Sequence, residues 1–175
     1  IATLAGATEV WFPNYDEIYP SEPTQISAGA VGELYEGAAR PGHFAGVLTV
    51  VNRLFEIVKP SAAVFGEKDF QQLWLIKNYF KKLEIVAVPT VREFDGLALS
   101  SRNIRLTQAD RVAALIISKA LKDPTRMHEI LATEPAFKLD YAEIIDEKTF
   151  QIASATTQNK RAIIAGWING VRLLD

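Results

Sequence analysis

A strand, a helix and a second strand follow one another closely in mid-chain, and this order restricts the fold more than any other feature. Residues 61–65 and 84–88 are short apolar runs, the second of them rich in β-branched side chains, and residues 68–83 show helical spacing of apolar positions. Two strands joined through a helix pair in parallel, because the connection is long enough to return the chain in the same direction. The sequence therefore predicts an α/β fold in which ligands bind at the carboxyl ends of parallel strands.

Gly66 lies at the predicted junction between the first strand and the helix. Backbone N–H groups at a helix start lack partners within the helix and suit an anion. Lys68 is expected on the first helical turn, where the helix dipole disfavours a positive charge, so its position indicates a negative ligand. The plainer alternatives are a turn glycine, a solvated lysine and, for Asp69, a carboxylate that only stabilises the helix N-terminus.

A second polar loop follows the second strand. Residues 95–103 read DGLALSSRN and bring together two hydroxyls, Ser100 and Ser101, and the guanidinium of Arg102. Hydroxyls and an arginine fork are typical of phosphate recognition. A polar loop that is merely well capped is the alternative, and a serine nucleophile is disfavoured because no G-x-S-x-G elbow is present.

Three segments in this order carry a family resemblance: EGAARPGHF (36–44), FGEKDFQQ (65–72) and DGLALSSRN (95–103). Together they resemble pantothenate synthetases, the pantoate–beta-alanine ligases. The resemblance runs over nearly the whole chain. It implies a partial Rossmann-like, parallel-sheet nucleotidyltransferase domain followed by a small α+β lid domain.

The resemblance also implies a reaction. ATP and (R)-pantoate give pantoyl adenylate and pyrophosphate, and beta-alanine then displaces AMP to form pantothenate. The implied partners are these small molecules and a second copy of the chain in a homodimer. Mg²⁺ is expected to be carried with ATP, because no acidic cluster in the sequence reads as a dedicated metal site.

Site residues are carried over position by position from the family motifs. Lys68 is expected to be catalytic, by stabilising the negative charge that develops during adenylation. Gln72, Arg40 and His43 are expected to contact pantoate. The residues expected to contact ATP are Gly66, Glu67, Lys68, Asp69, Val91, Leu99, Ser100, Ser101 and Arg102.

One family element has no counterpart in these residues. The family's first βα unit carries an H-x-G-H motif, whereas the two histidines here, His43 and His128, lie in other contexts. The chain thus resembles the C-terminal two-thirds of the enzyme and is expected to be inactive alone. A non-catalytic nucleotide-binding or assembly module derived from the same fold is the alternative reading.

Composition restricts the other classes. The hydrophobic fraction is 49 % and the charged fraction 23 %, as in ordinary globular proteins. The net charge of −2 argues against a nucleic-acid or acidic-membrane surface. There is no cysteine, hence no disulfide framework and no thiol ligand for zinc. Apolar runs are too short to cross a bilayer. A cytoplasmic enzyme is the expectation.

We expect two domains, residues 1–90 and 91–175. Thr107 to Asp110 reads as a capping box that opens a helix to about Leu121, and Asn169-Gly170 is a strong hairpin signal. The other expected elements are strands at 10–12, 140–146 and 160–168 and a helix at 44–58. The connections near 82–84 and 121–124 look short for the family, as if loops had been omitted. Without the family's first unit, we also expect the apolar surface of Val64, Phe65 and Val86 to be partly bare unless another segment or a partner covers it.

Overall fold

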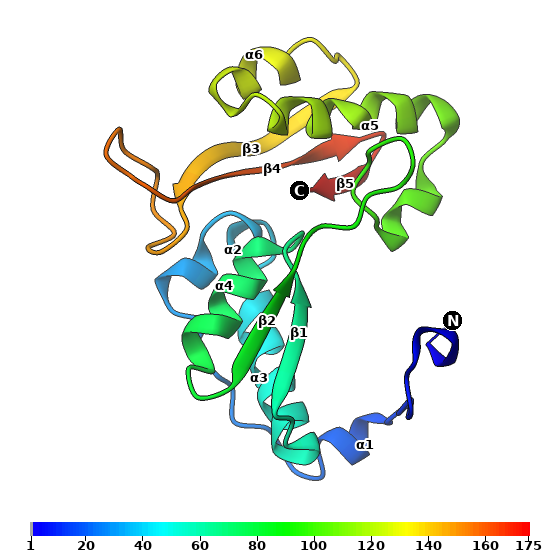
Figure 1. Ribbon diagram of the computed structural model, residues 1–175, viewed down its shortest axis with the longest axis vertical. Coiled ribbons are helices and arrows are strands. Elements are labelled where there is room, and N and C mark those ends of the chain that lie inside the picture. Colours follow the sequence, from blue (N-terminus) through cyan, green and yellow to red (C-terminus); the bar gives the residue numbers. More distant parts are fainter. Residues whose placement is uncertain (1) are drawn as a thin grey trace.

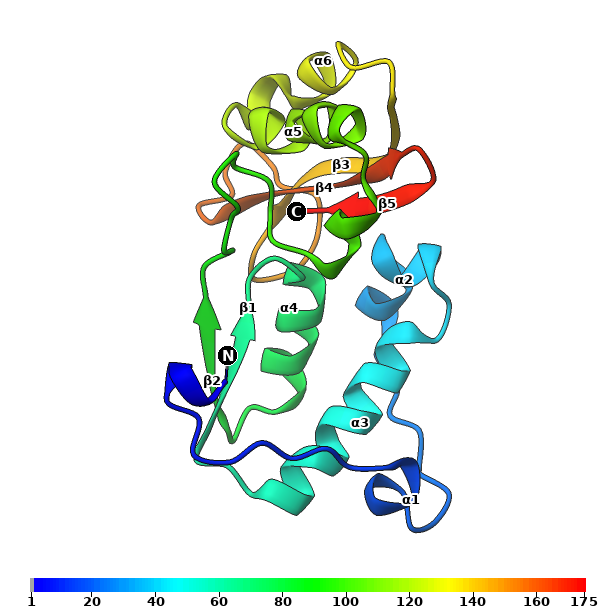
Figure 2. The ribbon, with the colours of Figure 1, turned by 90° about the vertical axis from the view of Figure 1, so that its right-hand side faces the viewer.

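The computed structural model describes residues 2–175 and shows two lobes, one stacked on the other (Figures 1 and 2). The first lobe contains a two-stranded parallel sheet and the second a three-stranded antiparallel sheet. The first-lobe elements are α1 (Tyr15–Ile18), α2 (Glu36–Ala39), α3 (His43–Val58), β1 (Ala62–Gly66), α4 (Phe70–Tyr79) and β2 (Glu84–Val88). The second-lobe elements are α5 (Gln108–Leu121), α6 (Met127–Leu131), β3 (Phe137–Asp146), β4 (Lys160–Ile168) and β5 (Val171–Leu174).

The parallel sheet confirms the predicted strand–helix–strand unit. β1 pairs with β2 in register, with Val64 opposite Val86. Helices α3 and α4 pack together beside the sheet and share a core that includes Phe44, Leu48 and Ile76. The packing follows from the apolar patterns of the sequence. The apolar stripes of two amphipathic helices cover the inner face of two short apolar strands.

The outer face of the parallel sheet is largely bare. Val64 is 65 % exposed, and Val86 and Val88 are each 40 % exposed. The expectation that Val64 and Val86 are uncovered is thus confirmed. Phe65 is less exposed than these valines, because successive side chains of a strand point to opposite faces and the partly buried Phe65 ring packs inward against Phe55.

The second lobe packs helices α5 and α6 on one face of the sheet β3–β4–β5 (Figure 2). The predicted capping box and the predicted hairpin turn of this lobe are both confirmed. Thr107 and Asp110 form a reciprocal capping box at the start of α5. Asn169 and Gly170 both have positive φ, 46° and 75°, in the tight turn between β4 and β5, as a two-residue hairpin of the primed type requires.

One predicted strand and three predicted boundaries were wrong. Residues 10–12 form no strand, since no neighbouring strand offers them hydrogen bonds, and Phe12 is 87 % exposed. Helix α4 begins at Phe70, so Lys68 precedes the helix rather than lying on its first turn. The same helix ends at Tyr79, before the expected residue 83. Strand β3 begins at Phe137, before the expected residue 140, because pairing with β4 extends it.

The two sheets lie on either side of Thr90, where the chain leaves β2 and enters the second lobe (Figure 1). The division into domains 1–90 and 91–175 stays a prediction. Short turns make the connections near 82–84 and 121–124. Within residues 2–175, no helix combines the length and the apolar character needed to cross a membrane.

Gly37 permits a close backbone approach at the top of the first lobe. A Cβ built on Gly37 would lie 1.8 Å from the carbonyl oxygen of Gly32, a backbone atom that cannot swing aside. Helix α2 is thereby pressed onto the preceding 3₁₀ turn, Ala30–Glu33. By contrast, a Cβ on Gly46, within α3, would meet nothing within 4 Å.

We expect the substitution Gly37→Ala to destabilise the protein by about 1–3 kcal/mol, the usual cost of forcing extra atoms into a packed site. Gly46→Ala is the matched control, and we expect it to stabilise by about 0.5–1 kcal/mol, because alanine loses less conformational entropy in a helix. Urea unfolding of both variants measures the difference. Equal free energies of unfolding would contradict the assigned role of Gly37.

Candidate functional site

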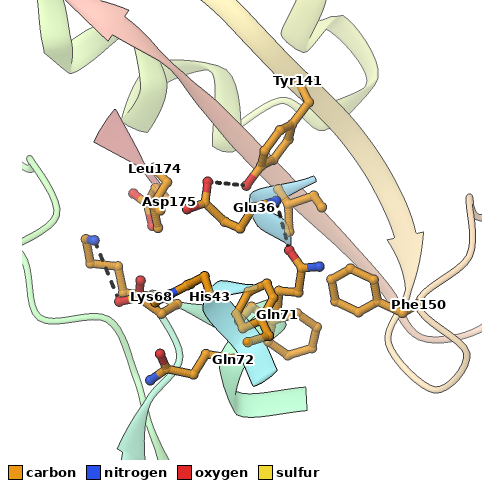
Figure 3. Close-up of a pocket in the computed structure, with 13 residues that line it drawn as sticks. Glu36, His43, Lys68, Gln71, Gln72, Tyr141, Phe150, Leu174 and Asp175 are labelled. Atoms are coloured by element: carbon orange, nitrogen blue, oxygen red, sulfur yellow. Dashed lines mark hydrogen bonds and ion pairs between the residues drawn. The ribbon is translucent and has the colours of Figure 1, made fainter. Parts of the chain in front are cut away.

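Two adjoining pockets lie at the interface between the lobes, and Lys68 lines both. The first pocket is lined from the first lobe by Glu36, His43, Asp69 and Gln72, with Tyr141 and Asp175 facing them from the second lobe (Figure 3). The second pocket is lined by second-lobe residues, Ser100 and Arg102 among them, and by Lys68 as the one first-lobe residue of the described chain. Lys68 therefore joins the two predicted halves of the site, and Leu174 and Asp175 of the second lobe also line both pockets.

The turn between β1 and α4 places Lys68. Glu67 extends the sheet by one bond, since its backbone N–H donates to the Val88 carbonyl at 2.8 Å. Helix α4 then starts at Phe70. The Lys68 ammonium lies 3.9 Å from the Asp69 carboxylate, and its side chain is 19 % exposed. Among the described residues this long ion pair is its only acidic contact within 4 Å, so the ammonium can approach an anion in either pocket.

The second polar loop, residues 95–103, is capped by its own hydrogen bonds, and some of its side chains also line the second pocket. Ser100 Oγ accepts a hydrogen bond from the Arg102 backbone N–H at 3.2 Å, a local cap. Arg102 donates to the Arg172 carbonyl at 3.3 Å. Buried Asn103 ties the loop down by donating to the Ala98 carbonyl at 3.0 Å. Ser100 and Arg102 nevertheless face the second pocket.

Not every predicted contact residue lines these two pockets. Val91 and Leu99 are exposed side chains joined through their backbones, the Leu99 N–H donating to the Val91 carbonyl at 2.8 Å. Ser101 and Gly66 are exposed. Glu67 is bound to Arg161 at 3.3 Å. An expected ATP role for these five residues is compatible with their exposed or edge positions, and it stays a prediction.

Arg40 and His43 form one unit beside the first pocket. Arg40 Nη1 lies 2.8 Å from His43 Nε2. Because a guanidinium can only donate, Nε2 accepts, and the imidazole is the neutral tautomer with its proton on Nδ1. Burial lowers the pKa of His43, and the Arg40 charge lowers it further. His43 therefore presents a neutral ring, with one N–H available, at neutral pH.

The two adjacent glutamines of FGEKDFQQ have different environments. Gln71 is buried: its amide N–H₂ donates to the Val31 and Leu34 carbonyls, and its oxygen accepts from the Glu36 backbone N–H. Gln72 also lines the first pocket, and it is only half-buried. Gln71 thus fixes the chain that carries Glu36, whereas Gln72 is a half-buried residue of the pocket lining.

Sequence reasoning did not single out the polar group above this pocket. Glu36 is 7 % exposed, and Tyr141 donates to its carboxylate across the interface between the lobes (Figure 3). Arg172 of the second lobe donates to the same carboxylate. Burial raises the pKa of Tyr141, and the Glu36 charge raises it further, so the phenol stays protonated and donates. Glu36 stands in the motif that carried the family resemblance, but nothing local to it points to residues over 100 positions later.

No group of three or more histidine, cysteine, aspartate or glutamate side chains that could hold a metal ion occurs in the described part of the chain. Of the acids at the first pocket, Glu36 is bound by Arg172 and Asp175 by Arg92, while Asp69 has no arginine partner. One such carboxylate suits a Mg²⁺ whose remaining ligands are phosphates and water.

We expect Arg40→Ala to raise the pKa of His43, because the change removes a nearby positive charge and leaves the burial. NMR titration of the imidazole C–H signals measures this, with His128→Gln used to assign the two rings. Arg126→Ala, which removes a surface partner of Glu129, is the control. A His43 pKa that is equal in both variants would contradict the proposed coupling.

Comparison with known proteins places the chain in a family. The family described as Pantoate-beta-alanine ligase matches residues 1–175. The pantothenate synthetase of Acidothermus cellulolyticus is 43 % identical over 97 % of this chain and 63 % of its own length. That of Rhizorhabdus wittichii is 43 % identical over 98 % of this chain and 67 % of its own length.

Solved structures agree with the sequence comparison. A crystal structure of pantothenate synthetase from Thermus thermophilus superposes with a TM-score of 0.90 at 38 % identity, covering 99 % of this chain and 70 % of the other. A Francisella tularensis pantoate-beta-alanine ligase, complexed with beta-gamma ATP and beta-alanine, has a TM-score of 0.67 at 32 % identity and covers 91 % of this chain and 60 % of the other. The chain spans about two-thirds of the length of such relatives, and it belongs to the pantoate-beta-alanine ligase family.

Proposed function

We propose that the chain is the ATP- and pantoate-binding part of a pantothenate synthetase, which condenses (R)-pantoate with beta-alanine. The observation that carries the proposal is the position of Lys68 at the junction of two pockets, in a chain matched from end to end by the family. The Francisella tularensis relative was crystallised with an ATP compound and beta-alanine, which supports the same substrates here.

The proposed reaction has two steps. A carboxylate oxygen of pantoate attacks the α-phosphorus of ATP, the bond to the β-phosphate breaks, and pyrophosphate leaves with pantoyl adenylate remaining. The neutral amine of beta-alanine then attacks the acyl carbon, AMP leaves, and the nitrogen loses a proton. Lys68 supplies a fixed positive charge where negative charge develops on the α-phosphate.

The remaining residues divide between the two substrates. We assign Gly66 to Asp69, Val91, Leu99 and residues 100–102 to ATP. Val91 and Leu99 are exposed, which leaves them open to a flat base, and Ser100 and Arg102 face the second pocket beside Lys68. Mg²⁺ bound to the phosphates would neutralise their charge, with Asp69 as the available carboxylate.

Gln72, Arg40 and His43 are assigned to pantoate. Gln72 and His43 line the first pocket with Lys68, and Arg40 holds the His43 ring. An amide and a neutral imidazole N–H match a hydroxy acid, which has both donors and acceptors. A cytoplasmic homodimer belongs to the same proposal, as the family resemblance implies.

Lys68→Ala tests the central assignment in the protein as its gene encodes it, including any residues that flank this chain. We expect pyrophosphate release from ATP and pantoate to fall roughly a hundredfold or more, since one preorganised charge of this kind contributes on the order of 3 kcal/mol. Lys77→Ala, on the exposed side of α4, is the control. A Lys68→Ala rate within about threefold of the parent, where tenfold is 1.36 kcal/mol, would exclude the role.

The same assay discriminates the alternative function. The 175-residue chain alone should form no AMP from ATP, pantoate and beta-alanine, because it lacks the family's H-x-G-H histidines. If the encoded protein also binds ATP without turnover, the non-catalytic nucleotide-binding or assembly module is the better description.

The paired glutamines give a second test. We expect Gln72→Ala to raise the KM for pantoate more than that for ATP and to leave the free energy of unfolding unchanged. Gln71→Ala should instead lower the free energy of unfolding by about 1–3 kcal/mol, since it leaves buried backbone groups without partners. Steady-state kinetics and urea unfolding separate the two effects. A Gln72→Ala effect confined to ATP would refute the assignment to pantoate.

A further inference from the structure

Arg161 of the second lobe contacts the Lys68 turn on both of its sides. Arg161 lies on β4, and its guanidinium is 4.1 Å from the centre of the Phe70 ring. Its Nη2 donates to Glu67 Oε2 at 3.3 Å. Glu67 immediately precedes Lys68, and Phe70 follows it by two positions. One side chain from the other lobe therefore touches both flanks of the turn that carries the proposed catalytic ammonium.

The guanidinium is itself held in place. Arg161 Nε donates to Glu147 Oε1 at 2.7 Å, within the second lobe. Backbone pairing of Arg161 with Ile145 fixes the base of the side chain. The Phe70 ring also stacks on Phe150, at 6.1 Å between ring centres, so it has second-lobe contacts both to Arg161 and to Phe150. The arginine is thus a preoriented part of the second lobe rather than a mobile surface group.

The turn has few other restraints. Sheet pairing reaches Glu67, through the bond to the Val88 carbonyl, and helical bonding resumes with the Leu73 N–H donating to the Asp69 carbonyl. Between these two points, the ion pair that Lys68 makes within the described residues is the long one with Asp69. The direction in which Lys68 projects therefore depends on the side-chain contacts that Glu67 and Phe70 make with the second lobe.

We propose that Arg161 is a positioning residue: it holds the Glu67–Phe70 turn so that the Lys68 ammonium faces the reacting phosphate when the lobes are together. The inference rests on the proposed function. Arg161 needs no contact with substrate for this role, because it acts through Glu67 and Phe70. A small displacement of a positioned charge lowers the rate of a chemical step more than it lowers binding.

The test uses Arg161→Ala, Glu67→Gln and the double variant in the protein as encoded, with Arg126→Ala as control. We expect each of the first two to lower kcat for adenylation roughly tenfold, equivalent to about 1.4 kcal/mol. The KM for pantoate should be unchanged. The double variant should resemble Arg161→Ala, because that change already removes the contact with Glu67 that Glu67→Gln weakens. Hydrogen exchange of the segment 66–70 should be faster in all three, and that of α5 unchanged.

Each contrary result has a distinct meaning. Turnover and exchange at the parent level in Arg161→Ala, with an active parent, would overturn the inference and leave the proposed function standing. A raised KM for ATP with unchanged kcat would make Arg161 an ATP ligand and also overturn it. An inactive parent would refute the proposed function, and exchange at 66–70 would then decide the inference alone. If Arg161→Ala fails to fold, Glu67→Gln decides in its place.

Discussion

The pairing of Glu36 with Arg172 is the interaction on which the arrangement of the two lobes depends. A carboxylate that is 7 % exposed is unfavourable unless its charge is matched, and removal of one partner of a buried ion pair typically costs about 3–5 kcal/mol. The match comes from Arg172 on β5, which Asp140 orients from β3. The first lobe can bury Glu36 in this way only with the second lobe in place.

The rest of the interface supports that pairing from both sides. Gln71 in α4 fixes the chain at Glu36, and Tyr35 packs its ring against Tyr141 and Phe150 of the second lobe. Arg161 makes a parallel contact with Glu67. Two arginines of one sheet thus reach two carboxylates of the other lobe, and each is also held by an acid of its own lobe. Both arginines thus bridge the two lobes close to the pockets that Lys68 lines: Glu36, the partner of Arg172, lines the first pocket, and Arg172 itself lines the second.

Features of the fold that depend on local chemistry could be predicted from the sequence. The strand pair at 62–88, the capping box of Thr107 and Asp110, and the turn at Asn169 and Gly170 follow from periodicity, side-chain capping and backbone preference.

Non-local features could not be predicted. The partners Glu36 and Arg172 lie 136 positions apart, and no local signal connects them. Gln71 and Gln72 have the same chemistry, and only the direction of α4 separates a buried structural amide from one at the pocket. The sequence motifs identified Lys68, Ser100 and Arg102 as candidates. They did not show that Lys68 precedes the helix, because the start of α4 was predicted too early.

The contiguity of each sheet has a consequence for how the molecule gains and loses structure. β1 and β2 lie within residues 62–88, and β3 to β5 within residues 137–174, so each sheet closes only short loops, which form fast and at low entropic cost. The contacts of Glu36 and Tyr35 with the second lobe close the longest loops and therefore form last. When the lobes separate, Glu36 and Arg172 become hydrated again. Separation therefore costs less free energy than it would for an apolar interface of equal size. The lobes are thus expected to part as two cooperative units before either sheet melts.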